Sequence, residues 1–375
     1  MLALASGSTA FAQVQLEPLI PPDSALKAAA HPLLGGGDHV TETVAFASGS
    51  KWHLTVNAVN KFGMVITGAS FQKSPTSPYV YVLFDGRLGE IFVPYHTGTP
   101  RYRDISFFNF EPLKLDPSDF PASREIIGVD KLICKELRDY LAWMTSNGAA
   151  RYGQEVVYFS VLGAGNYAYI MEWTFRDDGS IQARAGSTGP KAGGFPERGH
   201  MHNFTWRLDI DLNGAGANSA YWTSHLEQLA APFGAVDNRV PIEVEGSRVW
   251  NPEQFNTLEI GDARLQNGMG HKTSYELVPM RTGTARHNEP WTKADFWITR
   301  YRPSQLQAVN GNASQSLPDY ITGEPTITKD LVVWYTGSEH HENGSRDEDL
   351  NTVPVLWTGF ELVPHNLFDR TPFYP

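Results

Sequence analysis

The chain has 375 residues, 41% of them hydrophobic and 19% charged, which is enough apolar material for a packed core and excludes global disorder. The net charge is −11 with no long basic run, so neither nucleic acid nor an anionic membrane surface is an expected partner. A single cysteine, Cys134, excludes an intrachain disulfide framework and any metal site built on several cysteines.

The first residues are small, apolar and uncharged, and they end in an Ala-Phe-Ala sequence that is typical of a signal-peptide cleavage site. We therefore expect residues 1–12 to be the remnant of a secretory signal, and the protein to be secreted. Three Asn-x-Ser/Thr sequons, at Asn203, Asn312 and Asn343, predict a glycoprotein. No run of eighteen apolar residues occurs, so no transmembrane helix is predicted.

Residues 13–48 are rich in proline and glycine and are predicted to form an extended arm. Beyond them, short apolar or alternating runs broken by turn residues predict antiparallel strands. The expected strands lie at 52–56, 64–66, 79–84, 90–95, 156–163, 167–175, 180–187, 200–212, 220–231, 239–249, 271–279, 294–301, 331–337 and 355–363.

One region, residues 118–146, has apolar spacing that favours a helix. The rest shows no internal repeat and no alternation of strands with helices. Residues 49–375 are therefore predicted to form a single all-β domain, a large antiparallel β-sandwich with few short helices.

Two histidines flank Met201 within the expected strand 200–212. Because strand side chains alternate between faces, the imidazoles of His200 and His202 should share one face. Such a pair is a clamp for a divalent metal, and imidazole suits copper or zinc. Two polar residues on a solvated face would give the same pattern.

Two acids follow on the same expected strand with the opposite parity. An unbroken strand would place Asp209 and Asp211 on the face away from the histidines, as a separate site. Carboxylates suit a hard cation such as calcium, although solvated surface acids show the same spacing. Further along, His340 and His341 follow a strand, and because adjacent side chains point apart, at most one of them should join the first pair.

Several ordered motifs carry a family resemblance. HMHNFTWRLDIDLNG combines the two pairs just described, FSVLGAGNYAYIMEWTFRDDGSI surrounds Tyr167, and EIFVPYHTGTPRYR and FWITRYRPSQL form two further strands. The C-terminal stretch adds Trp334, Thr336, His341, Gly359, Phe360, Leu362, Pro364, Asn366 and Phe368. Together these motifs resemble the catalytic domain of the copper amine oxidases over roughly residues 50–372, which implies the β-sandwich fold of that family.

The resemblance implies two metal sites. Copper would be bound by His200, His202 and His341; His341 is preferred to His340 because it lies seven residues after Trp334, the offset of the family. A second, calcium-like site would use the side chains of Asp209, Asp211 and Asp330, with carbonyl oxygens from Ile210 and Leu331.

The resemblance also implies the cofactor. Tyr167 aligns with the tyrosine that family members oxidise, using copper and O₂, to trihydroxyphenylalanine quinone (topaquinone). That quinone converts a primary amine into an aldehyde and releases ammonia and hydrogen peroxide. Tyr95 matches the tyrosine that hydrogen-bonds the cofactor. Asn166 matches the asparagine that directly precedes the cofactor tyrosine in the family motif. A homodimer is expected, as in the family.

Two positions depart from the family pattern. The acid that should follow the cofactor tyrosine is replaced by Ala168. The catalytic base should lie fourteen residues after Tyr95, where this chain has Asn109, whose amide cannot accept a proton near neutral pH. Asp104 and Glu111 are nearby carboxylates, but neither lies at that offset.

Three functions follow from this pattern. The first is a secreted copper-dependent oxidoreductase that oxidises primary amines. The second is a repurposed enzyme that keeps the metal site, leaves Tyr167 unmodified and acts on another small molecule; Asn109 and Ala168 favour it. The third is a non-catalytic secreted binding protein, in which the three histidines contribute only to stability.

Overall fold

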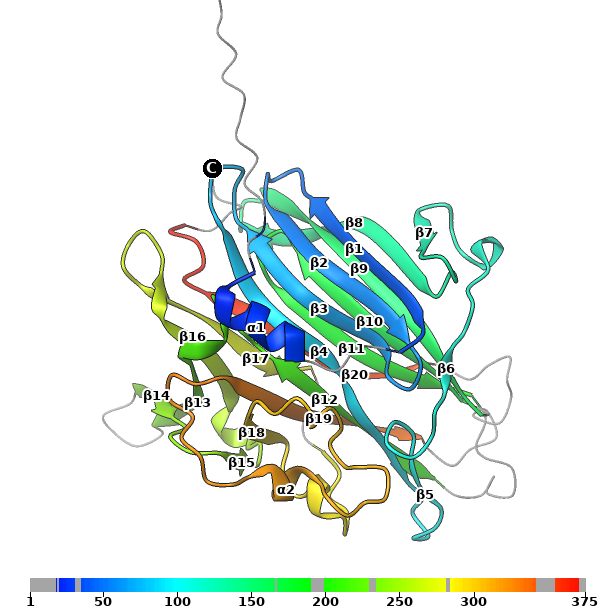
Figure 1. Ribbon diagram of the computed structural model, residues 1–375. Helices are drawn as coiled ribbons and strands as arrows, with labels where there is room; N and C mark the ends of the chain where they lie inside the picture. Colours follow the sequence, from blue (N-terminus) through cyan, green and yellow to red (C-terminus); the bar gives the residue numbers. More distant parts are fainter. Residues whose placement is uncertain are drawn as a thin grey trace, which may run out of the picture.

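Two antiparallel β-sheets face each other and enclose the main hydrophobic core (Figure 1). The computed structural model describes residues 18, 20–30, 35–165, 167–189, 199–228, 234–280, 284–341 and 355–370. The predicted all-β sandwich is thereby confirmed.

The first sheet brings together strands that are far apart in the sequence. Its order is β1-β2-β3-β4-β12-β19-β18-β15, with β5 beside β4, so that β12 lies between β4 and β19. The bounds are β1 (Gly37–Ala45), β2 (Lys51–Val59), β3 (Gly63–Gln72), β4 (Tyr79–Pro94), β5 (Arg101–Arg103), β12 (His200–Asp209), β15 (Gly246–Arg248), β18 (Phe296–Arg300) and β19 (Leu331–His341).

The second sheet has the order β14-β13-β16-β17-β20-β11-β10-β9-β8-β7, with β6 beside β9. Its bounds are β6 (Glu111–Pro112), β7 (Arg124–Ile127), β8 (Ile133–Met144), β9 (Ala150–Ala164), β10 (Tyr167–Arg176), β11 (Ile181–Thr188), β13 (Asn218–Gln228), β14 (Gly234–Pro241), β16 (Thr257–Gln266), β17 (Lys272–Pro279) and β20 (Leu356–His365).

Aromatic side chains from both sheets fill the space between them. Trp206 on β12 meets Phe360 on β20 edge to face, with ring centroids 5.5 Å apart. The sheets approach so closely at Gly86 that a Cβ atom there would lie 2.6 Å from the ring of Trp173. This packing sets the distance between side chains that the two sheets contribute to a common site.

Asp177-Asp178-Gly179 forms a tight hairpin turn in the second sheet. It joins β10 to β11, whose register pairs Phe175 with Ile181, and Gly179 adopts a positive φ of +88° that favours glycine.

The helix predicted over residues 118–146 is wrong. That region forms β7 and β8, and β8 pairs with β9 from Cys134 opposite Phe159 to Met144 opposite Ala150. Asn147-Gly148 is the turn between them, and this dipeptide is a hairpin signal. Leu137 and Leu141, whose spacing suggested a helix, are exposed residues of a strand.

The extended arm predicted over residues 13–48 is also wrong for most of its described part. Residues Pro22–Ala30 form the helix α1, and β1 pairs along its whole length with β2. The predicted signal remnant, residues 1–12, lies outside the described residues. The other helices are α2 (Leu317–Tyr320) and the 3₁₀ helices η1 (Pro117–Asp119), η2 (Ala215–Ala217), η3 (Pro252–Gln254) and η4 (Pro290–Thr292). Among the described residues, none of these helices has the length and apolar character needed to cross a membrane.

Candidate metal centre and active site

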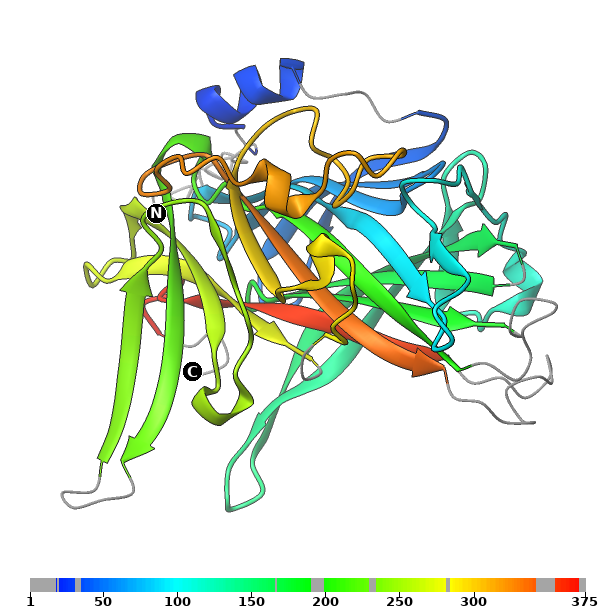
Figure 2. The same ribbon diagram turned by 90° about the horizontal axis from the view of Figure 1, so that it is seen from below.

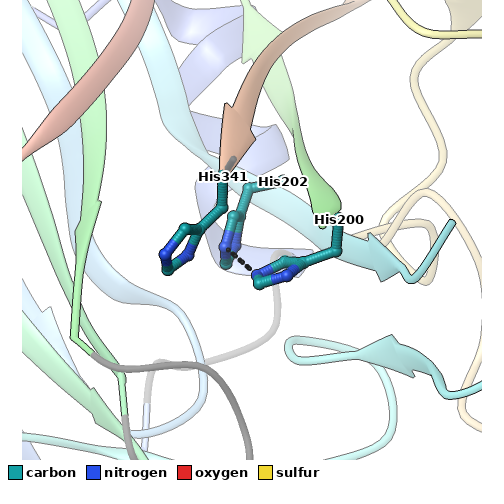
Figure 3. A group of neighbouring side chains, drawn as sticks. All are labelled: His200, His202 and His341. Atoms are coloured by element: carbon teal, nitrogen blue, oxygen red, sulfur yellow. Dashed lines mark hydrogen bonds between the residues drawn. The ribbon is translucent and has the colours of Figure 1, made fainter. Parts of the chain in front are cut away.

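Three histidines meet at one end of the β12–β19 strand pair (Figure 3). The antiparallel register places His200 directly opposite His341, and side-chain alternation puts His202 on the same face. All three are buried, and one ring nitrogen from each lies within 4.8 Å of the others. The Nε2 atoms of His200 and His202 are 3.0 Å apart. The structure therefore brings the predicted triad together.

The neighbouring His340 points away from the triad, as the alternation predicted. Its side chain is exposed, and its ring stacks on His96 with a centroid distance of 5.0 Å.

The triad consists of imidazoles suited to binding a metal ion. Burial, reinforced by repulsion from His200 and His341, holds the pKa of His202 well below its ordinary value, so that imidazole is neutral. Three convergent imidazole nitrogens are a donor set that copper prefers. The residues present thus fit the copper ion that the sequence implies.

Tyr167 reaches the triad from the opposite sheet. It is the first residue of β10 and is 8% exposed, and its hydroxyl lies 3.0 Å from Nε2 of His200 and 2.6 Å from Nδ1 of His341. Tyr95, at the end of β4, stacks on the imidazole of His200 with a centroid distance of 4.3 Å and an interplanar angle of 15°. Both predicted tyrosines therefore contact histidines of the triad.

A cavity of about 220 Å³ opens beside Tyr167. Its walls are mostly apolar and aromatic, and among the described residues that line it Asp104 is the one carboxylic acid. The lining residues are Val93, Tyr95, Tyr102, Asp104, Phe108, Phe110, Ala164, Gly165, Tyr167 and Tyr169.

Asp104 is buried and held by Tyr169. The Tyr169 hydroxyl donates a hydrogen bond to Oδ2 of Asp104 at 2.6 Å, and its ring stacks on that of Tyr167 with a centroid distance of 6.2 Å. Burial raises the pKa of Asp104 to about 7, although the hydrogen bond from Tyr169 opposes that shift. This wall of the cavity therefore carries a carboxyl group that titrates near neutral pH.

Glu90 anchors the loop that carries Asp104. Its Oε1 accepts hydrogen bonds from the backbone N–H groups of Ile91, Ile105 and Ser106, at 2.9, 3.0 and 3.3 Å. The backbone N–H of Asp104 donates to the carbonyl of Ile91 at 2.9 Å. The buried Glu90 side chain thus positions the residues next to Asp104.

Asn109, which has the sequence position of the family's catalytic base, does not lie in the wall of the cavity. Phe108 and Phe110 line the cavity and stack on each other with a centroid distance of 4.9 Å, while the residue between them is exposed. Asn166, the other predicted residue of the cofactor motif, lies outside the described residues.

Comparison with known proteins identifies the family. A family model described as copper amine oxidase, enzyme domain, matches residues 137–374. The chain belongs to the copper amine oxidase family.

Curated copper amine oxidases match most of this chain at low identity. Copper-containing amine oxidase alpha 2 of Arabidopsis thaliana is 24% identical over 86% of this chain and 58% of its own length. The primary amine oxidase of Klebsiella aerogenes is 23% identical over 86% of this chain and 52% of its own length. The chain thus spans somewhat more than half the length of these copper amine oxidases.

Solved structures of copper amine oxidases share the fold. The copper-containing benzylamine oxidase of Hansenula polymorpha superposes with a TM-score of 0.72 at 18% identity, covering 95% of this chain and 64% of that one. The Aspergillus nidulans amine oxidase gives a TM-score of 0.70 at 17% identity, covering 98% and 57%.

The opposite end of the β12–β19 pair holds the acids that the copper amine oxidase motifs place in a calcium-like site. Carboxylate oxygens of Asp209, Asp211 and Asp330 lie within 4.8 Å of one another, and we call these three residues the carboxylate cage. The cage is separate from the triad, as the parity of the sequence predicted. Ile210 and Leu331, the predicted carbonyl ligands, are buried next to these acids in the chain.

The calcium prediction does not fit the cage as it stands. The ammonium group of Lys27, from α1, lies 2.6 Å from Asp209 Oδ1, 3.1 Å from Asp211 Oδ1 and 2.8 Å from Asp330 Oδ1. Burial by itself lowers the pKa of Lys27, but attraction to the three carboxylates outweighs it and raises the pKa above its ordinary value. A protonated amine therefore takes the position that a calcium ion would need.

The structure rules out one of the three predicted glycosylation sites. Asn203 is 1% exposed within β12, and its Nδ2 donates a hydrogen bond to the carbonyl of Phe92 at 3.1 Å, so no glycan can be attached there in the folded protein. Asn312 is exposed, and Asn343 lies outside the described residues.

Proposed function

We propose that this protein is a copper-dependent oxidase of small primary amines in which Tyr167 is the precursor of the quinone. The observation that carries this proposal is the Tyr167 hydroxyl, hydrogen-bonded between His200 and His341 at the wall of a cavity. The overall reaction converts an amine, O₂ and water into an aldehyde, ammonia and hydrogen peroxide. When bound, copper and the quinone derived from Tyr167 supply the electron transfer from the amine to O₂.

The chain's own residues prepare this chemistry. His200, His202 and His341 would hold the copper ion. Tyr95 packs flat on His200 and fixes the orientation of that ring, as the partners of metal-binding histidines commonly do. The two sheets, which contribute the histidines and Tyr167 separately, hold the hydroxyl against the ligands and exclude bulk water from them.

Asp104 is the general base in this proposal, in place of the acid that is missing at position 109. It lines the same cavity as Tyr167, and the hydrogen bond from Tyr169 fixes one of its oxygens. A carboxyl group whose pKa is near the working pH is an efficient proton acceptor, because it is deprotonated and still basic. Asp104 would take the proton from the carbon next to the amine nitrogen.

The cavity favours a small amine with an apolar or aromatic group. Its volume of about 220 Å³ is below the range that holds drug-sized ligands. Tyr102, Phe108 and Phe110 offer aromatic faces for such a group. Benzylamine, the substrate named for the Hansenula polymorpha relative, is therefore a suitable first probe.

Secretion and homodimeric assembly are further proposals. The Ala-Phe-Ala sequence near the start of the chain supports secretion, and membership of the family supports the dimer. Recovery of the protein from culture medium and its molar mass by light scattering test them.

The test of the proposed function starts from protein loaded with copper in air. We expect about one copper ion per chain, a coloured adduct with phenylhydrazine and an altered peptide mass at Tyr167. Benzylamine should then release hydrogen peroxide. The variant Y167F should keep its copper and lose both the adduct and the turnover.

Two outcomes would contradict the proposal in different ways. An unmodified Tyr167 in a copper-loaded protein would instead support the repurposed enzyme. A folded protein that binds no copper would support the non-catalytic binding protein.

A further inference from the structure

Lys27 enters the carboxylate cage from a helix on the outside of the sandwich. Figure 2 shows α1 on the outer side of the first sheet, away from the second sheet. The Lys27 side chain is only 4% exposed, and its ammonium group donates hydrogen bonds to one oxygen each of Asp209 and Asp330 and to both oxygens of Asp211. The number of donors on an ammonium group matches the number of acids around it.

Two aromatic rings complete the enclosure of this ammonium group. Nζ of Lys27 lies 4.1 Å from the ring centroid of Tyr301 and 4.5 Å from that of Phe84. A cation is attracted to the face of an aromatic ring, and the attraction increases when water is excluded. Carboxylates and ring faces around one point are the surroundings that recognise an organic cation.

Other residues of α1 hold the helix in the position that Lys27 requires. Ser24 and Lys27 are three residues apart and lie on the same side of the helix, and the Ser24 hydroxyl donates to Oδ2 of Asp211 at 3.0 Å. Asp23 accepts a hydrogen bond from the backbone N–H of Gly216 at 2.9 Å. The helix is thus attached both to the cage and to the segment after β12.

The charge balance around the cage requires a cation. Asp85 joins the cage acids in one buried network, and Arg207 contacts both Asp85 and Asp209, at 3.1 and 3.3 Å. Arg87 pairs with Asp85. Among the described residues, these ion pairs place two guanidinium groups beside four acids once Lys27 is removed, and loss of one partner of a buried ion pair is strongly destabilising.

We infer that the carboxylate cage is a binding site for an ammonium group, filled within the same chain by Lys27, so that α1 supplies the cation that the cage needs. This inference does not rest on the proposed function, because the cage and the copper ligands lie at opposite ends of β12. It carries a direct consequence: removal of the Lys27 charge leaves three convergent carboxylates, which is a site for a hard cation.

The experiment compares wild-type protein with K27M, both as copper-loaded full-length chains. Terbium serves as the probe, since it prefers carboxylate oxygens and Tyr301 can sensitise its luminescence. Wild-type protein should bind no terbium at the cage, and calcium should leave its melting temperature unchanged. K27M should melt roughly 5–10 °C lower, bind about one terbium ion per chain and recover stability with calcium.

Matched variants test whether loss of the Lys27 charge causes the lower melting temperature and the terbium binding of K27M. K114M changes an exposed lysine and should behave as wild type. K27R keeps the charge and should bind no terbium. Combining K27M with D330N removes one cage ligand and should abolish the gain of terbium binding.

The inference would be overturned by wild-type protein that binds terbium at a site lost in D330N, or by K27M that keeps its melting temperature and gains no terbium. If K27M does not fold, the inference is tested on wild-type protein by measuring how fast acetic anhydride labels its lysine side chains. Lys27 should react at least about tenfold more slowly than Lys114, because its amine is buried and paired. Equal rates would contradict the inference.

Discussion

The two ends of the β12–β19 strand pair each bring three side chains suited to metal binding close together, but the two clusters differ in charge. At one end three imidazoles converge on the inner side of the first sheet, and at the other three carboxylates converge on its outer side. Asp209 lies nine positions after His200, which is about 30 Å along a strand. Spacing on the strand thus accounts for both clusters, and the difference between them lies in charge.

That difference explains which cluster needs an internal cation. Neutral imidazoles can lie together before a metal arrives, and burial favours their neutral form. Carboxylates repel one another and are costly to bury, so burial and Asp209 raise the pKa of Asp211 and of Asp330, and a positive charge among them opposes that rise. Lys27 supplies that charge at the acidic end. The comparison teaches that ligand spacing predicts where donors meet, while the net charge of the donors decides what must lie between them.

The largest effect is expected from removing a copper ligand. H202A should lose its copper and with it all measurable amine turnover, since even an outer-shell change can cost up to about 100-fold. Copper analysis and a hydrogen peroxide assay measure this. K27M is the control: it should lose stability yet keep its turnover per copper within about twofold, since it lies about 30 Å away. Equal losses of turnover in both variants would break the comparison.

A smaller loss of kcat is expected from replacing Asp104. This residue lies near the histidine triad, so the loss would show that the reaction takes place at that end of the strand pair. D104N should lower kcat by about 10²–10⁴-fold with copper retained, because an amide cannot take the substrate proton. E111Q changes an exposed carboxylate and should leave kcat near that of the wild type.

The pH profile shows whether Asp104 acts as the base or only packs. A base must be deprotonated, so wild-type kcat/KM should fall as the pH drops through the Asp104 pKa of about 7. D104N should lack this fall near pH 7, whereas the fall caused by protonation of the amine substrate should remain in both proteins. A fall near pH 7 that is the same in both proteins would remove Asp104 from the mechanism.

The smallest effect is expected at Asn109. N109D restores an acid at the family's position, but the side chain is exposed and does not line the cavity, so turnover should change by less than about twofold. Steady-state kinetics with benzylamine measures it. A large gain in turnover would show that Asn109, rather than Asp104, lies near the reacting carbon.

Much of the site could be predicted from local patterns. Alternation along one strand placed His200 and His202 together and Asp209 apart from them. The resemblance to the copper amine oxidases, through the offset from Trp334, selected His341 over His340. The same patterns failed over residues 118–146, where apolar spacing outweighed the Asn147-Gly148 turn signal. They also missed α1, whose short sequence buries few side chains and is stabilised by contacts with the rest of the chain.

The sequence by itself determined the β-sandwich and the parity of the histidines and acids on their strand, because these follow from short alternating runs and the period of two along a strand. Tyr167 was assigned by the resemblance of its motif to the copper amine oxidases. Only the tertiary structure decided which acid reaches the cavity and which cation fills the cage. Asp104 is buried beside Tyr169, 65 residues away in the chain, and Lys27 meets Asp209 across 182 residues. Contacts at such separations depend on how sheets, loops and helices pack, and no local period records them.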